Sequence, residues 1–156
     1  MANPIRVLLR VPVPWVFVLA YLVGVGLEFV RPTTLFLKAP QITTSVGAML
    51  FTAGAIIAGW GLVLFRKAHT TTVPGRISAR LVNYGPYQFT RNPMYVGLTL
   101  AYLGETGLLK QIWPLAMLPF VLAYLNWVVI PLEETRLIQV FGMEYDRYRA
   151  QVRRWI

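Results

Sequence analysis

The stretch LVNYGPYQFTRNPMY, residues 81–95, decides how the rest of this chain is interpreted. It combines four aromatic rings with glycine, proline and polar residues, and it lies between two apolar runs. Its two X-Pro steps, Gly85-Pro86 and Asn92-Pro93, disfavour helix at the residue before each proline. We therefore predict a shaped loop where the membrane meets water, and we expect its rings to form one wall of a small-molecule site.

The composition is that of an integral membrane protein. Of the 156 residues 56% are hydrophobic and only 13% are charged, against roughly 25% charged in soluble domains. The length favours a single domain. The net charge is +9, and the Lys and Arg residues that carry it lie between apolar runs. This position favours anionic lipid headgroups over nucleic acid as the partner. The absence of cysteine excludes disulfides, thiolate metal ligands and a cysteine nucleophile. No residue pattern specifies an oligomeric state.

Four apolar runs predict an all-α membrane bundle of about four spans, at residues 13–30, 45–65, 94–109 and 112–132. About 20 apolar residues cross the hydrocarbon core, so the third run is short. The first run is too long for a signal peptide, and no small-residue cleavage motif follows it. We divide the single domain into two N-terminal spans, residues 1–65, and a cofactor-binding half, residues 66–156.

Small residues, a proline and a glutamate within the spans allow further predictions. Gly54 with Ala58, and Ala55 with Gly59, place small residues one turn apart, a spacing that lets another helix approach closely. Pro119 predicts a kink in the fourth span. Two further expectations concern the third span. Its glycines at 97, 104 and 107 are expected to leave room for a ligand, and its Glu105 is expected to pair with Lys110 at the interface.

The tail after residue 132 predicts an amphipathic helix lying in the membrane surface. Arginines occupy one side, and the apolar stripe continues through Tyr145, Tyr148, Val152 and Trp155. With four spans, twelve of the 15 Lys and Arg residues fall on the side that holds both termini. The positive-inside rule therefore predicts cytoplasmic termini, and it places the 81–95 loop beside Glu133 and Glu134 on that side.

Several chemistries are excluded by the residue inventory. His69 is the only histidine and Asp146 the only aspartate, which argues against a metal centre and against a Ser-His-Asp triad. No phosphate-binding glycine loop follows a strand. Glu133 and Glu134 are either first-turn helix residues favoured by the helix dipole or ligands for an ammonium or for ribose hydroxyls. With aromatic rings able to face a sulfonium, the set suits S-adenosylmethionine, although residue types alone do not single it out.

Three motifs in order make the chain resemble a known family. They are GPYQFTRNPMY at residues 85–95, the pair Glu133-Glu134, and FGMEYDRY at residues 141–148. The chain from about residue 70 onward resembles the isoprenylcysteine carboxyl methyltransferases, which are grouped with the phospholipid N-methyltransferases. The resemblance implies a helical membrane bundle that binds S-adenosyl-L-methionine. The cofactor-binding residues that it implies are Ala79, Arg80, Leu81, Val82, Tyr87, Asn92, Pro93, Met94, Tyr95, Glu133 and Glu134.

Two positions depart from the pattern of the family. Asn92 stands where the family commonly has histidine, and an amide is neither a cation nor a general base near neutral pH. Val129 stands where the prenylcysteine enzymes carry an arginine for the substrate carboxylate. We therefore predict methyl transfer from S-adenosylmethionine to a lipophilic acceptor, namely a lipid amine, a thiol or a prenylcysteine-type carboxylate, which would enter between the third and fourth spans.

The catalytic residues stay unassigned. The available bases are Glu133, Glu134, Glu105 and His69. The alternatives are an NADPH-dependent membrane reductase and a non-catalytic membrane scaffold.

Overall fold

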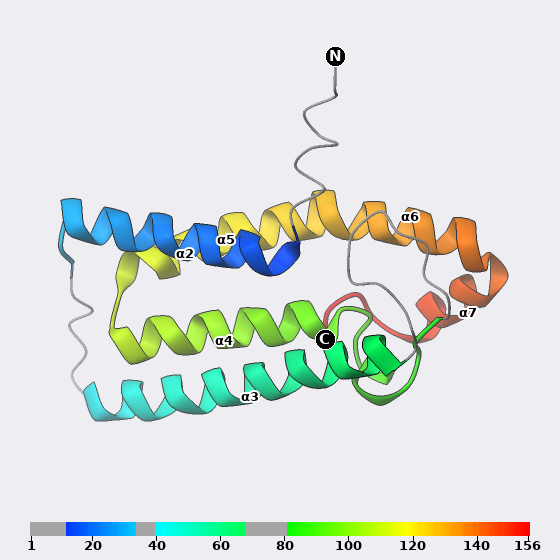
Figure 1. The fold of residues 1–156 in the computed structure, drawn as a ribbon, viewed down its shortest axis with the longest axis horizontal. Helices are drawn as coiled ribbons and strands as arrows, with labels where there is room; N and C mark the ends of the chain where they lie inside the picture. Colours follow the sequence, from blue (N-terminus) through cyan, green and yellow to red (C-terminus); the bar gives the residue numbers. More distant parts are fainter. Residues whose placement is uncertain (1–11, 34–39, 68–80) are drawn as a thin grey trace, which may run out of the picture.

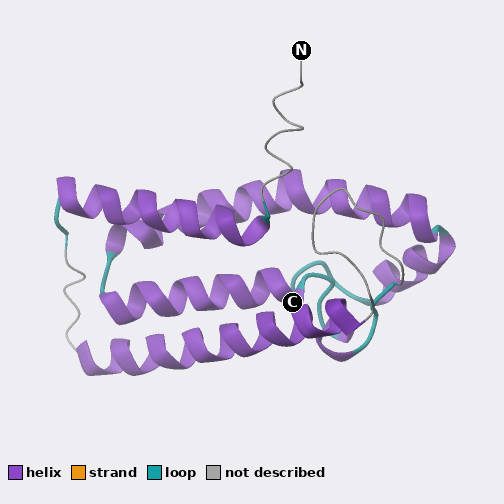
Figure 2. Ribbon diagram, viewed as in Figure 1, coloured by secondary structure: helices purple, strands orange, loops and turns teal. Residues whose placement is uncertain are grey.

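The computed structural model describes residues 12–33, 40–67 and 81–156, and within these ranges all regular structure is helical (Figures 1 and 2). Its elements in chain order are α2 (Val13–Val30), α3 (Pro40–Lys67), the 3₁₀ turn η1 (Gly85–Gln88), α4 (Pro93–Leu109), α5 (Ile112–Tyr124), the π-helical turn η2 (Leu125–Val129), α6 (Ile130–Phe141) and α7 (Met143–Gln151). The all-α prediction is confirmed.

Within the described residues, three helical segments are long and apolar enough to cross a membrane: Val13–Val30, Gln41–Lys67 and Ile112–Phe141. The third expected span, α4, has 17 residues and is short, as its sequence predicts. Large apolar side chains face outward on α2 and α3, for example Leu22 and Ile56, with 58% and 63% of their surface exposed. An outward-facing apolar surface of this kind is solvated by lipid, so the chain is an integral membrane protein.

The fourth span does not end near residue 132, as the sequence predicts. The helix continues through η2 and α6 as far as Phe141, and Figure 1 shows α6 extending in line with α5. In η2 the Ile130 N–H donates to the Leu125 carbonyl, one residue further back than in an α-helix. The wider turn lies directly before Pro131, whose ring would clash with the preceding turn of an ordinary α-helix. The π-helical turn therefore explains how the helix passes this proline.

Small residues bring α3 and α4 into backbone contact. A Cβ atom added to Gly97 would lie 2.5 Å from the Ala58 nitrogen and 2.7 Å from the Gly54 carbonyl. The predicted packing role of Gly54 and Ala58 is thereby confirmed, whereas Gly59 has open space around it. Gly104 likewise packs against the backbone of α3. The expectation that these α4 glycines leave room for a ligand is wrong, because α3 fills the space.

A second contact joins α2, α4 and α5 around an apolar core. Its most buried members include Phe17, Tyr102, Leu118 and Leu125. The Tyr102 hydroxyl donates to the Pro114 carbonyl at 2.7 Å, so this buried phenol is satisfied. The expected Glu105–Lys110 ion pair is absent from the part of the chain that the structure describes.

The tail folds back rather than forming one interfacial helix. Gly142 joins α6 to α7 with φ of +51°, a conformation that side chains with a Cβ rarely adopt. Tyr145 and Tyr148 are buried, but α7 ends at Gln151 and Val152 is extended. The predicted stripe is therefore wrong beyond Tyr148, because Val152 and Trp155 lie outside the helix. Figure 1 shows α6, α7 and the start of α4 at the same end of the bundle.

Candidate functional site

The 81–92 loop is anchored to α3 and α7 by its aromatic residues. The Tyr87 ring packs on Phe65 of α3, with ring centroids 5.4 Å apart, and Val82 joins the same apolar cluster. From the other side, the Tyr148 hydroxyl of α7 donates to the Tyr87 carbonyl at 2.7 Å. Gly85 has φ of +63°, which permits the tight turn of η1. The loop is thus held between α3 and α7 as a shaped, non-helical segment around the turn η1.

The Tyr87 hydroxyl is buried and has no hydrogen-bond partner among the described residues. It lies next to Gly61 of α3, where an added Cβ would be 3.6 Å from the hydroxyl oxygen and 2.8 Å from the Met94 side chain. Burial raises the pKa of Tyr87 well above its usual value, so the group is a neutral phenol that can donate. A buried donor without a partner costs free energy, which makes this hydroxyl a candidate ligand contact.

Tyr95 and Glu133 meet across the site. Tyr95, in the first turn of α4, is 7% exposed, and its hydroxyl donates to Glu133 Oε1 at 2.7 Å. Glu133 is only partly buried, and no ion pair with it occurs within the described ranges. A carboxylate held by a single phenol keeps acceptor capacity for a ligand.

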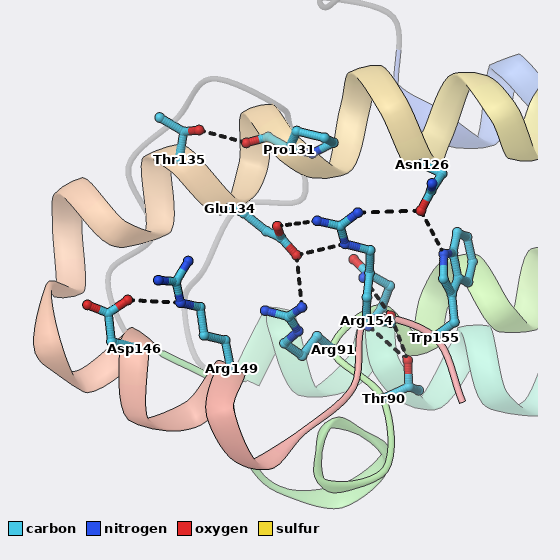
Figure 3. A network of polar contacts seen from close by, with 11 residues as sticks. Thr90, Arg91, Asn126, Pro131, Glu134, Thr135, Asp146, Arg149, Arg154 and Trp155 are labelled. Carbon is cyan, nitrogen blue, oxygen red and sulfur yellow. Dashed lines mark hydrogen bonds and ion pairs between the residues drawn. The ribbon is translucent and has the colours of Figure 1, made fainter.

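Glu134, the next residue on α6, is in a different situation. Its Oε1 lies 3.1 Å from Arg91 Nη2, and its Oε2 lies 2.7 Å from Arg154 Nη2 (Figure 3). Its side chain is 15% exposed. Both carboxylate oxygens are thus committed to arginines of the protein, and hydrogen bonding to Glu134 raises the pKa of Arg154.

Asn92 also binds within the protein. Its side-chain Nδ2 donates to the Arg154 carbonyl at 2.8 Å, and Thr90 Oγ1 donates to the same oxygen at 3.2 Å. Asn92 precedes α4 but makes no side-chain cap bond to it. The amide that replaces the usual histidine of the family therefore holds residues 152–155 in place.

The structure gathers most of the predicted cofactor-binding residues at one end of the molecule. Val82, Tyr87, Pro93 and Tyr95 are buried there, and Leu81, Asn92, Met94, Glu133 and Glu134 are partly buried. Ala79 and Arg80, like the candidate base His69, lie outside the described residues. Whether any of these residues binds a cofactor stays a prediction.

The sequence analysis did not single out Asn126, Arg154 or Trp155 as parts of this region. Asn126 Oδ1 accepts from the Trp155 indole at 3.1 Å and lies 3.5 Å from Arg154 Nη1. One signal was present, since Asn126 is the only amide between residues 112 and 132. The role of Arg154 had no such signal, because it is one of several arginines in a basic tail.

A hollow of about 460 Å³ lies beside α7, away from Glu133. Polar side chains of the loop and α7 line most of it, among them Asn83, Gln88, Glu144 and Arg147. Neither Tyr95 nor Glu133 is among its lining residues. It is therefore separate from the Tyr87–Tyr95–Glu133 cluster, which is the candidate site.

Comparison with known proteins gives a consistent result. The family profile described as phospholipid methyltransferase matches residues 42–144, which is more than half of the chain. Two curated relatives, from Oryza sativa subsp. indica and subsp. japonica, carry the name probable protein-S-isoprenylcysteine O-methyltransferase. Each is 28% identical over 132 residues, covering 81% of this chain and 68% of the relative. No solved structure matches. On the strength of the profile match, this integral-membrane chain belongs to the phospholipid methyltransferase family.

Proposed function

We propose that the chain transfers a methyl group from S-adenosyl-L-methionine to a lipophilic acceptor. The observation that carries the proposal is the Tyr87–Tyr95–Glu133 cluster. It combines a carboxylate held by one phenol at 2.7 Å with a second, buried phenol that has no partner among the described residues. These groups match the polar parts of the cofactor, because a carboxylate can accept from an ammonium or from ribose hydroxyls and a phenol can donate to an acceptor.

In this proposal the residues of the cluster bind and orient. Glu133 holds the polar end of the cofactor, Tyr95 aims the Glu133 carboxylate, and Tyr87 supplies the free donor. When bound, S-adenosylmethionine supplies an electrophilic methyl group on a sulfonium. The protein then contributes chiefly positioning and exclusion of water. Leu81, Val82, Pro93 and Met94 would provide the apolar surface, whereas Asn92 and Glu134 would act by holding neighbouring parts of the protein.

The acceptor class follows from the membrane setting and from Val129. The name of the rice relatives supports a prenylcysteine carboxylate as acceptor, and the name of the matched family supports a phospholipid. Val129 is 3% exposed and packs in the apolar core, so no cation stands at this position to bind a carboxylate. We therefore favour a lipid amine or a thiol.

An acceptor amine must lose a proton before it attacks. The positions of the candidate bases in the fold exclude some of them. Glu105 follows Tyr95 by ten residues of α4, which is about 15 Å along a helix. Both oxygens of Glu134 are paired with arginines. Among the described residues considered as bases, position leaves only Glu133, and because this proposal gives Glu133 to the cofactor, the base stays unassigned.

Calorimetry on the purified protein in detergent tests the proposal. Wild-type protein is expected to bind S-adenosylmethionine and S-adenosylhomocysteine but not NADPH, and Glu133→Gln is expected to abolish binding without unfolding the protein. Binding of NADPH alone would establish a reductase, and binding of none of the three would support a scaffold. A screen with a labelled methyl group against lipid amines, thiols and prenylcysteines then identifies the acceptor.

A further inference from the structure

Residues 152–155 follow α7 without regular structure and lie between the loop and the long helix. Val152 has φ of −118° and ψ of 132°, and the following backbone bonds to the loop. The Arg91 N–H donates to the Arg153 carbonyl at 2.9 Å, and the Arg154 carbonyl accepts from Asn92 and Thr90. Three hydrogen bonds therefore attach this segment to the loop that carries Tyr87 and leads into Tyr95.

The side chains of the same segment attach to the opposite wall. Arg154 makes a two-pronged contact with Glu134 of α6, from Nε to Oε1 at 3.1 Å and from Nη2 to Oε2 at 2.7 Å (Figure 3). The Trp155 indole donates to Asn126 in the π-helical turn at 3.1 Å. Residues 152–155 thus bridge the two walls of the candidate site, and Arg154 contacts both of them.

Fixing Glu134 also fixes the direction of Glu133. The two residues are neighbours on α6, where successive side chains are about 100° apart around the axis. If Arg154 and Arg91 hold Glu134, the rotation of this part of the helix is set, and Glu133 is directed toward Tyr95. The contact is partly shielded from water, with 15% of the Glu134 side chain and 33% of the Arg154 side chain exposed. A two-pronged arginine–carboxylate contact imposes geometry as well as attraction.

We propose that Arg154 is a positioning residue for Glu133, acting through Glu134 and through the loop. The adjacent glutamates then have different roles: Glu134 attaches α6 to the two arginines, and Glu133 contacts the cofactor. This inference rests on the proposed function, because its consequence is the affinity for S-adenosylmethionine.

The test compares binding of S-adenosylmethionine by wild-type protein, Arg154→Ala and Arg149→Ala, together with the unfolding temperature of each. Arg154→Ala is expected to weaken binding by about ten-fold, which corresponds to about 1.4 kcal/mol of binding free energy. Arg149→Ala is the matched control, because Asp146 is the one ion-pair partner of Arg149 among the described residues and both side chains are 46% exposed. It is expected to change affinity by less than about two-fold.

Two further variants separate positioning from general destabilisation. Gly104→Ala perturbs the α3–α4 contact nine residues along α4 from Tyr95, so it should lower the unfolding temperature while leaving the affinity unchanged. Both substitutions in the double variant Glu134→Gln/Arg154→Ala break the same contact. The double variant should therefore bind S-adenosylmethionine no more weakly than whichever of the two single variants has the lower affinity.

The outcomes distinguish the two proposals. Wild-type protein that binds S-adenosylmethionine, with Arg154→Ala binding equally well, overturns the positioning role alone. An affinity loss in Arg154→Ala no larger than that in an equally destabilised Gly104→Ala also overturns it. Wild-type protein that binds no S-adenosylmethionine overturns the proposed function.

Discussion

Tyr87 and Tyr102 are equally buried phenols that differ in what their hydroxyl groups contact. Each is 4% exposed. The Tyr102 hydroxyl donates to the Pro114 carbonyl, whereas the Tyr87 hydroxyl has no partner among the described residues. A protein gains nothing in stability from a buried hydroxyl that makes no hydrogen bond. We therefore propose that the Tyr87 hydroxyl donates to a bound ligand.

The two phenols give opposite expectations when the hydroxyl is removed. Tyr87→Phe should leave the free energy of unfolding unchanged or raise it, because it deletes an unsatisfied donor, and it should weaken binding of S-adenosylmethionine. Tyr102→Phe should destabilise the protein by about 1 kcal/mol and leave the affinity unchanged. Thermal unfolding and calorimetry on both variants measure the contrast. A destabilised Tyr87→Phe with wild-type affinity would show that the hydroxyl serves the fold instead.

The roles of the adjacent glutamates can be predicted only in part from the sequence. Their identity and order predict a carboxylate pair near the loop, and Tyr95 does meet Glu133. Sequence cannot show that Glu134 is already paired with two arginines, because one of them lies 20 residues downstream. That pairing depends on the turn at Gly142 and on the end of α7, which together return the chain to the loop.

The contact between α3 and α4 is set by glycines, and two of these helical glycines make a controlled comparison. A Cβ at Gly97 would meet the backbone of α3 at 2.5 Å, whereas one at Gly59 would meet nothing within 4 Å. Gly97→Ala should therefore force the helices apart and destabilise the protein by about 1–3 kcal/mol. Gly59→Ala should be neutral or stabilise by up to about 1 kcal/mol, because alanine favours helix.

Thermal unfolding of the two alanine variants in the same detergent gives the sign and size of each effect. If both lower the unfolding temperature equally, the glycines do not control the α3–α4 distance. The small-residue spacing in the sequence predicts the contact, but it does not say which of the two candidate pairs faces α4. Only the relative rotation of the helices decides that, and it selects Gly54 and Ala58.

The end of the long helix from Ile112 to Phe141 could not be predicted from local sequence patterns. Pro131 and the following charges predict that the span ends near residue 132, yet the helix passes the proline by way of a π-helical turn. That turn carries Asn126 and ends at Val129, so it contributes both an anchor for residues 152–155 and a buried position in the same apolar core as Tyr95. Its hydrogen-bond register depends on the packing around it and cannot be read from residue preferences.

Across the molecule, the hydropathy pattern predicts the class of fold because burial in lipid is the largest energy involved. Four apolar runs therefore suffice for the four-helix bundle, and the turn signals locate the loop. The site is only partly predictable. The contacts between the loop and the C-terminal segment, such as that of Asn92 with Arg154, join residues 62 positions apart. They depend on how the tail folds back.

The charge distribution predicts the orientation of the bundle in the membrane. The expected four spans assign twelve of the 15 basic residues to the site side, and the exposed arginines among the described residues at this end include Arg136, Arg147, Arg149 and Arg153. Arginines at this end also suit an anionic leaflet. We propose that this end faces the cytoplasm, where positive loops are retained and where S-adenosylmethionine is available.

Because the chain contains no cysteine, single cysteines can report this orientation directly. Leu109→Cys lies at the far end of α4, where Leu109 is 57% exposed, and Ala150→Cys lies on the exposed side of α7. In intact cells a membrane-impermeant maleimide should label Leu109→Cys and not Ala150→Cys, and after permeabilisation it should label both. The cysteine-free parent controls for background labelling. Labelling of Ala150→Cys alone in intact cells would reverse the orientation and place the candidate site on the side opposite its expected cofactor, because Tyr148 on the same helix contacts the loop that carries Tyr87.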